Sequence, residues 1–160
     1  TIILDGFSKS YSMQGWRVGF VVGNAEAIGR LSKIKANVDF SVFPAMQRAA
    51  ARILVGPQDC IEFYRAKYRE RRDAAMAGLE RLGWWALRPK AGMYVWGRVP
   101  AAYGSSFEFV TDVIRNTGVV LSPGSGFGNA GEGYFRIALV EEKARIEEAF
   151  GRIEKWGGGK

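Results

Sequence analysis

Lys9 is the residue of this chain that is best placed for covalent chemistry. It comes shortly after the apolar, β-branched run Thr1–Leu4, which predicts a buried strand, and two hydroxyl side chains, Ser8 and Ser10, flank it. A lysine amine at the end of a buried strand is partly desolvated, which favours its neutral form. Because only a neutral amine attacks a carbonyl carbon, this position suits a nucleophilic lysine.

Arg17 could bind an anion beside that lysine. It belongs to the segment Trp16–Val22, whose alternation predicts a second strand with Arg17 and Gly19 on one face. Gly19 would leave room for a ligand, and the planar, permanently charged guanidinium matches a phosphate. A lysine able to form a Schiff base, an arginine that binds an anion and the Ser8 hydroxyl are typical of a pyridoxal phosphate site. The alternative is a loop lysine and a strand-end arginine in water.

The composition excludes several other kinds of active site. The chain contains no histidine, so Ser-His-Asp triads, Cys-His pairs and histidine-ligated metals are ruled out. Its one cysteine, Cys60, cannot form an internal disulfide or a cysteine-rich zinc site, and we predict no metal. A single cysteine is compatible with a reducing cytosol, and we expect a cytoplasmic protein.

The chain is basic, since 23 Lys and Arg against 16 Asp and Glu give a formal net charge of +7. Such a charge can attract nucleic acid, an anionic membrane or an anionic small molecule. The densest basic segment, 65–72, lies in a long helix predicted at 59–82, where Glu62 and Glu70 interleave with the cations. We interpret it as a solvated helix face and predict no nucleic-acid partner. No apolar run approaches the ~18 residues of a membrane span, so no membrane partner is expected.

A glycine-rich motif at 126–131 matches the G-x-G-x-x-G pattern of dinucleotide sites. In those sites a helix opens directly from the glycines, and its N-terminus holds the pyrophosphate. Here the run Tyr134–Leu139 follows, and it predicts a strand. We therefore interpret 123–133 as a tight connection between strands.

Strands and helices alternate along the chain, which indicates α/β layers. Apolar residues at helical spacing predict helices at 25–37, 45–54, 59–82, 106–116 and 141–156. Short β-rich runs predict further strands at 85–88, 93–99, 119–122 and 134–139.

Arg136 is a second candidate for anion binding. Along the strand 134–139, Arg136 shares a face with Ala138, opposite the apolar face of Phe135, Ile137 and Leu139. Arg136 should therefore point away from the core, with space beside the small Ala138. An edge-strand arginine in plain solvent is the alternative.

Three segments resemble the class I and II aminotransferases, in the order in which that family has them. Residues 6–19, GFSKSYSMQGWRVG, are similar to the family's lysine signature. The segment 91–96, AGMYVW, resembles its glycine-plus-aromatic strand, and 119–124 with 135–139 resembles its substrate-arginine segment. Within the family, the segments GWRVGFVVGN and PGSGFGNAGEGYFRIAL are most similar to LL-diaminopimelate aminotransferases.

The resemblance implies the C-terminal part of a fold-type-I, pyridoxal-phosphate-dependent transferase with an α/β fold. Residues 1–58 would be the end of the large domain with its connecting helices, and 59–160 the small C-terminal domain. The abrupt start at Thr1, without an initiator Met, leads us to expect further sequence upstream. The intact enzyme would be a homodimer acting on small amino acids and 2-oxo acids, and the isolated chain is expected to be inactive.

The resemblance also assigns roles to single residues. Lys9 would hold the cofactor and move the substrate α-proton, Arg17 would bind the cofactor phosphate, and Arg136 would bind the substrate α-carboxylate. Many relatives carry serine three residues before the lysine as a phosphate ligand, whereas this chain has Gly6. One phosphate hydrogen bond would then be missing or supplied by Ser8.

Three other functions remain open at the level of sequence. The substrates could be those of an aspartate- or alanine-type aminotransferase rather than LL-diaminopimelate and 2-oxoglutarate in lysine biosynthesis. The chain could be a catalytically silent aminotransferase-like domain of a transcription regulator, which an upstream DNA-binding domain would reveal. A basic binding module is the third, and salt-dependent association with nucleic acid would reveal it.

Overall fold

The computed structural model describes residues 1–158, and its contacts divide the chain between Arg65 and Ala66 into two units, each with its own core. The division falls inside the long helix α4 (Asp59–Leu82). The domain boundary expected from the sequence lies before Asp59, the first residue of the same helix.

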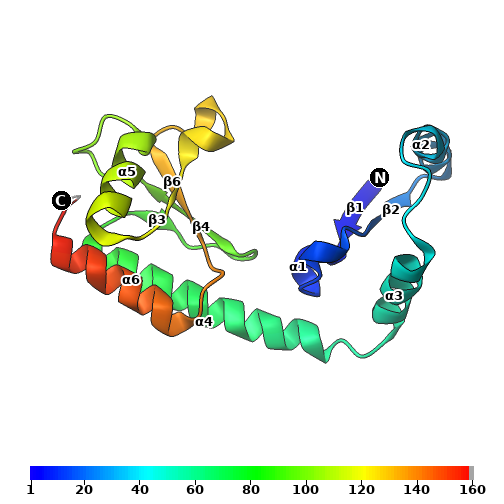
Figure 1. Cartoon of the computed structure of the whole chain (residues 1–160), viewed down its shortest axis with the longest axis horizontal. Helices are drawn as coiled ribbons and strands as arrows, with labels where there is room; N and C mark the ends of the chain where they lie inside the picture. The colour runs from blue at the N-terminus through cyan, green and yellow to red at the C-terminus, as the bar shows by residue number, and fades with distance from the viewer. Residues whose placement is uncertain (159–160) are drawn as a thin grey trace. The chain divides into compact units, whose positions relative to one another are not determined.

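The first unit is built on a two-stranded antiparallel ladder (Figure 1). Strand β1 (Ile2–Gly6) pairs with β2 (Gly19–Gly23), in a register that joins Gly6 to Gly19. The turn α1 (Phe7–Ser10) and the 3-10 turn η1 (Gln14–Trp16) connect the two strands. The strand predicted at 16–22 therefore begins three residues later than expected.

Two helices complete this unit. Helix α2 (Ala25–Val38) begins where the Asn24 side chain accepts a hydrogen bond of 3.0 Å from the backbone N–H of Ala27. Helix α3 (Pro44–Val55) has Pro44 in its first turn, where the missing N–H costs nothing. A small core gathers Phe7, Met13, Val18 and Ala50.

The second unit is a four-stranded antiparallel sheet in the order β3-β4-β6-β5. Its strands are β3 (Ala86–Leu87), β4 (Tyr94–Arg98), β5 (Ser122–Pro123) and β6 (Tyr134–Ala138). Most of the run predicted as a strand at 119–122 is irregular, and only its last residue enters the ladder. Strand β6 lies between β4 and β5, so it is an interior strand, and the alternative of an edge-strand arginine is excluded.

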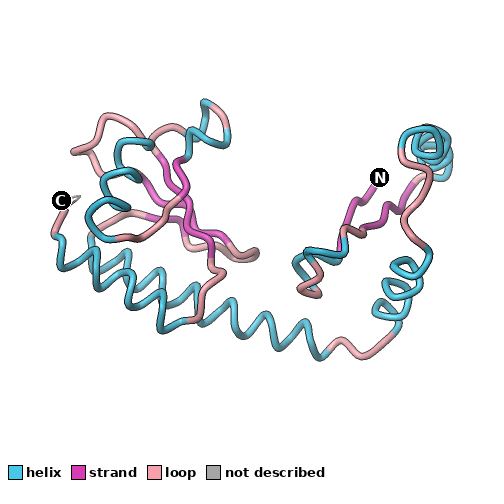
Figure 2. Tube along the Cα trace, viewed as in Figure 1, coloured by secondary structure: helices cyan, strands magenta, loops and turns pink. Residues whose placement is uncertain are grey.

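Three helices pack on this unit's sheet. Figure 1 shows α6 (Lys143–Trp156) running alongside α4, with α5 (Ser106–Thr117) beside the strands. Helix α4 is continuous over 24 residues, as the tube in Figure 2 shows. The helix ends at Leu82, and the next residue, Gly83, has a positive φ of 71°. This conformation lets the backbone N–H of Trp84 donate to the carbonyl of Leu79 at 2.9 Å.

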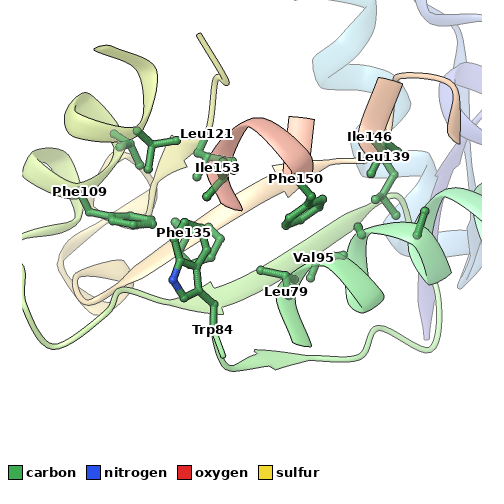
Figure 3. Close-up of a cluster of buried hydrophobic side chains, with 14 residues drawn as sticks. Leu79, Trp84, Val95, Phe109, Leu121, Phe135, Leu139, Ile146, Phe150 and Ile153 are labelled. Atoms are coloured by element: carbon green, nitrogen blue, oxygen red, sulfur yellow. The ribbon is translucent and has the colours of Figure 1, made fainter. Parts of the chain in front are cut away.

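The core of the second unit lies between these helices and one face of the sheet (Figure 3). Phe109 from α5, Phe135 from β6 and Trp84 pack with ring centroids 5.0 to 5.7 Å apart. Phe135 and Leu139 are fully buried, as the alternation along the strand predicts. The layered α/β architecture expected from the sequence is confirmed, and the opposite face of the sheet carries Arg136.

Candidate active site

Lys9 lies on a single helical turn that a buried aromatic ring anchors. Phe7, two residues earlier, is 2% exposed, and its carbonyl accepts from the backbone N–H groups of Tyr11 at 3.2 Å and Met13 at 3.4 Å. Lys9 itself is exposed. The strand expected before it is present as β1, but its expected burial is wrong for the described chain, because the core of this unit forms around Phe7 and leaves β1 exposed.

Arg17 adopts a left-handed backbone conformation, with φ 50° and ψ 46°, just before β2 begins. Its Nη1 atom donates to the carbonyl of Gln14 at 3.2 Å, which holds the side chain over the 3-10 turn. The expectation that Arg17 and Gly19 share a strand face is therefore wrong.

Gly19 serves the pairing of the strands rather than a ligand. A Cβ at this position would lie 2.8 Å from the carbonyl oxygen of Asp5 on β1. Real Cβ atoms essentially never come this close, so the absent side chain lets the two backbones approach. The space that the sequence assigned to a ligand is filled by β1.

The ladder itself brings the candidate cofactor residues to one end. The N–H of Phe7 donates to the carbonyl of Val18 at 3.4 Å, which extends the pairing one residue beyond Gly6 and Gly19. Ser8 and Lys9 directly follow Phe7, and Arg17 directly precedes Val18. The backbone positions of Ser8, Lys9 and Arg17 thus lie at the same end of two paired segments. Their hydroxyl, amine and guanidinium groups are of the kinds that fit a phosphate ester that also carries an aldehyde.

The second candidate for anion binding, Arg136, lies in the other unit, on the sheet face away from the helices. Arg136 is half-buried, and its Nε atom is buried with no hydrogen-bond partner among residues 1–158. Its Cζ atom lies 4.2 Å from the ring centroid of Tyr94 on β4 and 4.2 Å from that of Phe127. A buried N–H without an acceptor on a charged group is uncommon in folded proteins, and it marks Arg136 as a candidate functional residue.

Sequence reasoning did not assign Tyr94 or Phe127 to this site. Tyr94 belongs to the glycine-plus-aromatic strand, which the sequence analysis named only as a segment. Phe127 is an aromatic residue inside a glycine-rich turn, at 49% exposure. A large apolar side chain in such a turn was the available signal.

The glycine-rich connection forms two 3-10 turns, η2 (Gly124–Phe127) and η3 (Asn129–Gly131), and strand β6 follows. The connection between strands is therefore confirmed, and the dinucleotide interpretation stays rejected. A Cβ on Gly124 or Gly131 would collide with the backbone of the other glycine, so close contact between the two turns requires both.

Glu132 fastens this connection to the start of α5. Its Oε1 atom accepts from the N–H of Ser106 at 2.6 Å and from its neighbour Gly133 at 2.8 Å, and Oε2 accepts from the Ser106 hydroxyl at 3.1 Å. The backbone N–H groups of Gly133 and Ser106 lower the pKa of Glu132 below its usual value. Ser106, which is fully buried, also contacts the hydroxyl of Ser125 at 3.1 Å.

The basic segment of α4 is paired with carboxylates of the same chain. Arg71 donates to Glu142 and, at 3.3 Å, to the carbonyl of Leu139, and its side chain is 12% exposed. Arg72 lies 2.9 Å from Asp73, at 23% side-chain exposure. The solvated face expected from the sequence is wrong for these two arginines, because their side chains are largely buried. Their pairing leaves a weaker basic surface than the composition suggests.

Two further kinds of site find no support in the described part of the chain. Within residues 1–158, no group of three or more Cys, Asp or Glu side chains could hold a metal ion. None of the helices in this range combines the length and the hydropathy needed to cross a membrane.

Comparison with known proteins identifies one family over nearly the whole chain. The aminotransferase class I and II family matches residues 1–153. The chain is 50% identical over 153 residues to LL-diaminopimelate aminotransferase of Nitratidesulfovibrio vulgaris (strain DSM 19637 / Miyazaki F), and 44% identical over 154 residues to that of Moorella thermoacetica. Both matches cover 96% of this chain and 39% of the relative, so the chain spans about two fifths of these relatives' length.

Solved structures agree with the sequence comparison. An aromatic aminotransferase from Pyrococcus horikoshii superposes with a TM-score of 0.91 at 33% identity, over 97% of this chain and 42% of that one. A probable N-succinyldiaminopimelate aminotransferase from Thermus thermophilus gives 0.89 at 36% identity, over 97% and 41%. The fold is therefore that of part of a fold-type-I transferase. With sequence, fold and the order of its lysine and arginine segments all in agreement, this chain belongs to the class I and II aminotransferases.

Proposed function

We propose that the protein containing this chain is a pyridoxal-phosphate-dependent aminotransferase, which exchanges an amino group between an amino acid and a 2-oxo acid. The observation that carries the proposal is that strand pairing places the backbone positions of Ser8, Lys9 and Arg17 at one end of the β1–β2 ladder. An amine, a hydroxyl and a guanidinium are the groups that an aldehyde-bearing phosphate ester requires.

Three residues would hold the cofactor. Arg17, whose Nη1 is fixed on the carbonyl of Gln14, presents its guanidinium to the phosphate, and the Ser8 hydroxyl donates to the same group. When bound, pyridoxal phosphate supplies an electron sink for the pair released as the substrate Cα–H bond breaks. Lys9 binds the cofactor through its amine and moves the proton at the substrate Cα as general acid and base.

Arg136 would bind the α-carboxylate that amino donor and 2-oxo acid share. Its guanidinium offers parallel N–H groups that match a carboxylate bidentately. The buried Nε atom, which has no acceptor among the described residues, supports a functional role for this arginine, because an unpaired charged group is rarely kept without one.

The substrates we propose are LL-diaminopimelate as amino donor and 2-oxoglutarate as acceptor, in lysine biosynthesis. Support comes from relatives named LL-diaminopimelate aminotransferase, which share up to 50% identity over nearly the whole chain. Residues 1–58 are assigned to the large domain and 59–160 to the small one. Cys60, exposed and free of a disulfide, fits the cytoplasm.

We assign a homodimer to the intact enzyme. Large apolar side chains on the first unit are exposed, among them Ile2, Ile3, Leu4 and Val22 of the β1–β2 ladder. Apolar groups this closely spaced are normally covered, either by the rest of the polypeptide or by a partner subunit.

Two measurements on the full-length protein test this function. Borohydride reduction and peptide mapping should place a pyridoxyl group on Lys9; a label on another lysine would reject the assignment. With 2-oxoglutarate as acceptor, LL-diaminopimelate should give a higher kcat/KM than aspartate or alanine. A preference for aspartate or alanine would keep the reaction and reject the substrate. No transfer from any donor, together with no label, would favour a catalytically silent domain.

A further inference from the structure

The guanidinium of Arg136 lies against two aromatic rings that come from different elements. Tyr94 reaches it along the sheet, since Tyr94 pairs with Ala138 and is therefore the diagonal neighbour of Arg136 on the same face. Phe127 reaches it from the 3-10 turn η2. Both centroids lie 4.2 Å from Cζ, well within the ~6 Å range of cation–π attraction. We call Tyr94, Phe127 and Arg136 the arginine clamp.

The small size of Ala138 makes this arrangement possible. The side chain directly opposite Tyr94 is a methyl group, so the tyrosine ring can lean toward Arg136. The space expected beside Ala138 lies on the side of Arg136 where the Tyr94 ring packs.

Phe127 is held in place by contacts on both sides. Its ring packs edge-on against Trp96, with centroids 5.3 Å apart and planes at 72°. Two residues earlier, the backbone N–H of Ser125 donates to the buried Ser106 hydroxyl at 3.3 Å, and that hydroxyl also contacts Glu132 at 3.1 Å. The turn that carries Phe127 is thus tied to the start of α5, although the ring itself is half exposed.

An arginine side chain has several rotatable bonds, and fixing it costs binding energy unless the protein has fixed it beforehand. Ring contacts restrict the guanidinium and keep water from the atoms that they cover. We propose that Phe127 is a positioning residue, which together with Tyr94 fixes the Arg136 guanidinium in the plane that receives a substrate carboxylate. This inference rests on the proposed function of Arg136.

The full-length enzyme with Phe127→Leu tests the inference. KM should rise about 3- to 30-fold for both the amino donor and 2-oxoglutarate, as expected from losing one cation–π contact. The Kd for pyridoxal phosphate and the melting temperature should stay unchanged, because the ring is exposed and lies outside the core. Phe127→Tyr should restore both KM values, since it keeps an aromatic face.

Phe107→Leu is the matched control, because Phe107 is an exposed phenylalanine of the same unit, at 67% exposure, outside the clamp. Its KM values should equal those of the unsubstituted enzyme. Unchanged KM values in Phe127→Leu, or no rescue by Phe127→Tyr, would overturn the inference. Arg136→Lys distinguishes failure of the proposed Arg136 role from failure of the Phe127 positioning role. If Arg136→Lys leaves both half-reactions intact, the proposed role of Arg136 is rejected. If Arg136→Lys impairs both half-reactions while Phe127→Leu does not, only the positioning role of Phe127 is rejected.

Discussion

At the scale of residues, the pairing of β1 with β2, extended by one hydrogen bond, decides how the candidate cofactor site is assembled. The pairing of Phe7 with Val18 places Lys9 and Arg17 at the same end of the ladder, although neither lies in a strand. Arg17 keeps a positive φ of 50°, an uncommon state for a residue with a side chain. Residues held in such conformations are common at binding sites, which agrees with the role that we propose for Arg17.

Arg17→Leu should weaken retention of pyridoxal phosphate about 10- to 100-fold, because a charge-assisted hydrogen bond contributes roughly 1.5–3 kcal/mol. The fold should be kept, since the side chain is exposed. Titration of the full-length apoenzyme with the cofactor, followed by absorbance, measures the change. An unaltered Kd would contradict the phosphate role.

Gly6→Ser is the companion to that experiment. A Cβ at Gly6 would lie 3.6 Å from the carbonyl oxygen of Val18, which is an ordinary contact, so a serine fits. If a phosphate hydrogen bond is missing here, the added hydroxyl should lower the cofactor Kd in the same titration. No gain would indicate that Ser8 already supplies that bond.

Arg136→Lys should lower kcat and raise KM in the half-reactions of both substrates, because a lysine offers a point charge in place of the guanidinium fork. Cofactor affinity should be nearly unaffected. Single-turnover kinetics with each substrate separate the two effects. An effect on only one substrate would mean that Arg136 binds a side-chain carboxylate instead of the shared one.

At the scale of elements, the close packing of α4 on α6 depends on Gly78. A Cβ at Gly78 would overlap the ring of Phe150, which is itself buried. Gly78→Ala should therefore destabilise the protein by about 1–3 kcal/mol of overpacking, which outweighs the roughly 1 kcal/mol gained in helix propensity. Urea unfolding of the full-length protein measures the net change.

Gly151 provides the matched comparison in α6. It lies inside the helix with nothing within 4 Å of the position of an added Cβ. Gly151→Ala should therefore stabilise the protein by about 0.5–1 kcal/mol. If both substitutions moved stability in the same direction, packing at Gly78 would not be the cause.

The connection between β5 and β6 should respond to pH through Glu132. Its pKa is lowered chiefly by hydrogen bonds from the backbone N–H groups of Gly133 and Ser106, so the folded state favours the carboxylate. The stability that it contributes is present above its unfolded pKa, near 4.5, and is lost as the pH falls through the folded pKa. Glu132→Gln should flatten the stability profile in that acid range, as measured by urea unfolding at several pH values. An identical slope in both proteins would reject this linkage.

At the scale of the whole molecule, the chain carries two cores of unequal size, and the smaller one leaves much apolar surface uncovered. The first unit buries four hydrophobic side chains in its cluster, whereas the second buries fourteen. Because the chain spans about two fifths of its relatives' length, we expect groups from outside it to complete the proposed site of Lys9. We expect the 160-residue chain to bind pyridoxal phosphate more weakly than the full-length protein, in parallel absorbance titrations. Equal affinities would show that Ser8, Lys9 and Arg17 suffice.

Local sequence patterns were sufficient to predict the helices, the lysine segment and the face of Arg136. Helical spacing places α4 within its observed bounds, and alternation along β6 puts Phe135 and Leu139 in the core. The resemblance of residues 6–19 to the lysine signature of the class I and II aminotransferases could likewise be recognised without any knowledge of the fold.

The surroundings of these residues could be learned only from the folded chain. Folding placed β6 inside the sheet, filled the space at Gly19 with β1, and paired Arg71 with Glu142. It also brought Phe127 to Arg136, through strand pairing and the 3-10 turn between β5 and β6. The spacing of residues encodes which way a side chain points, but long-range pairing and turn geometry decide what it meets there.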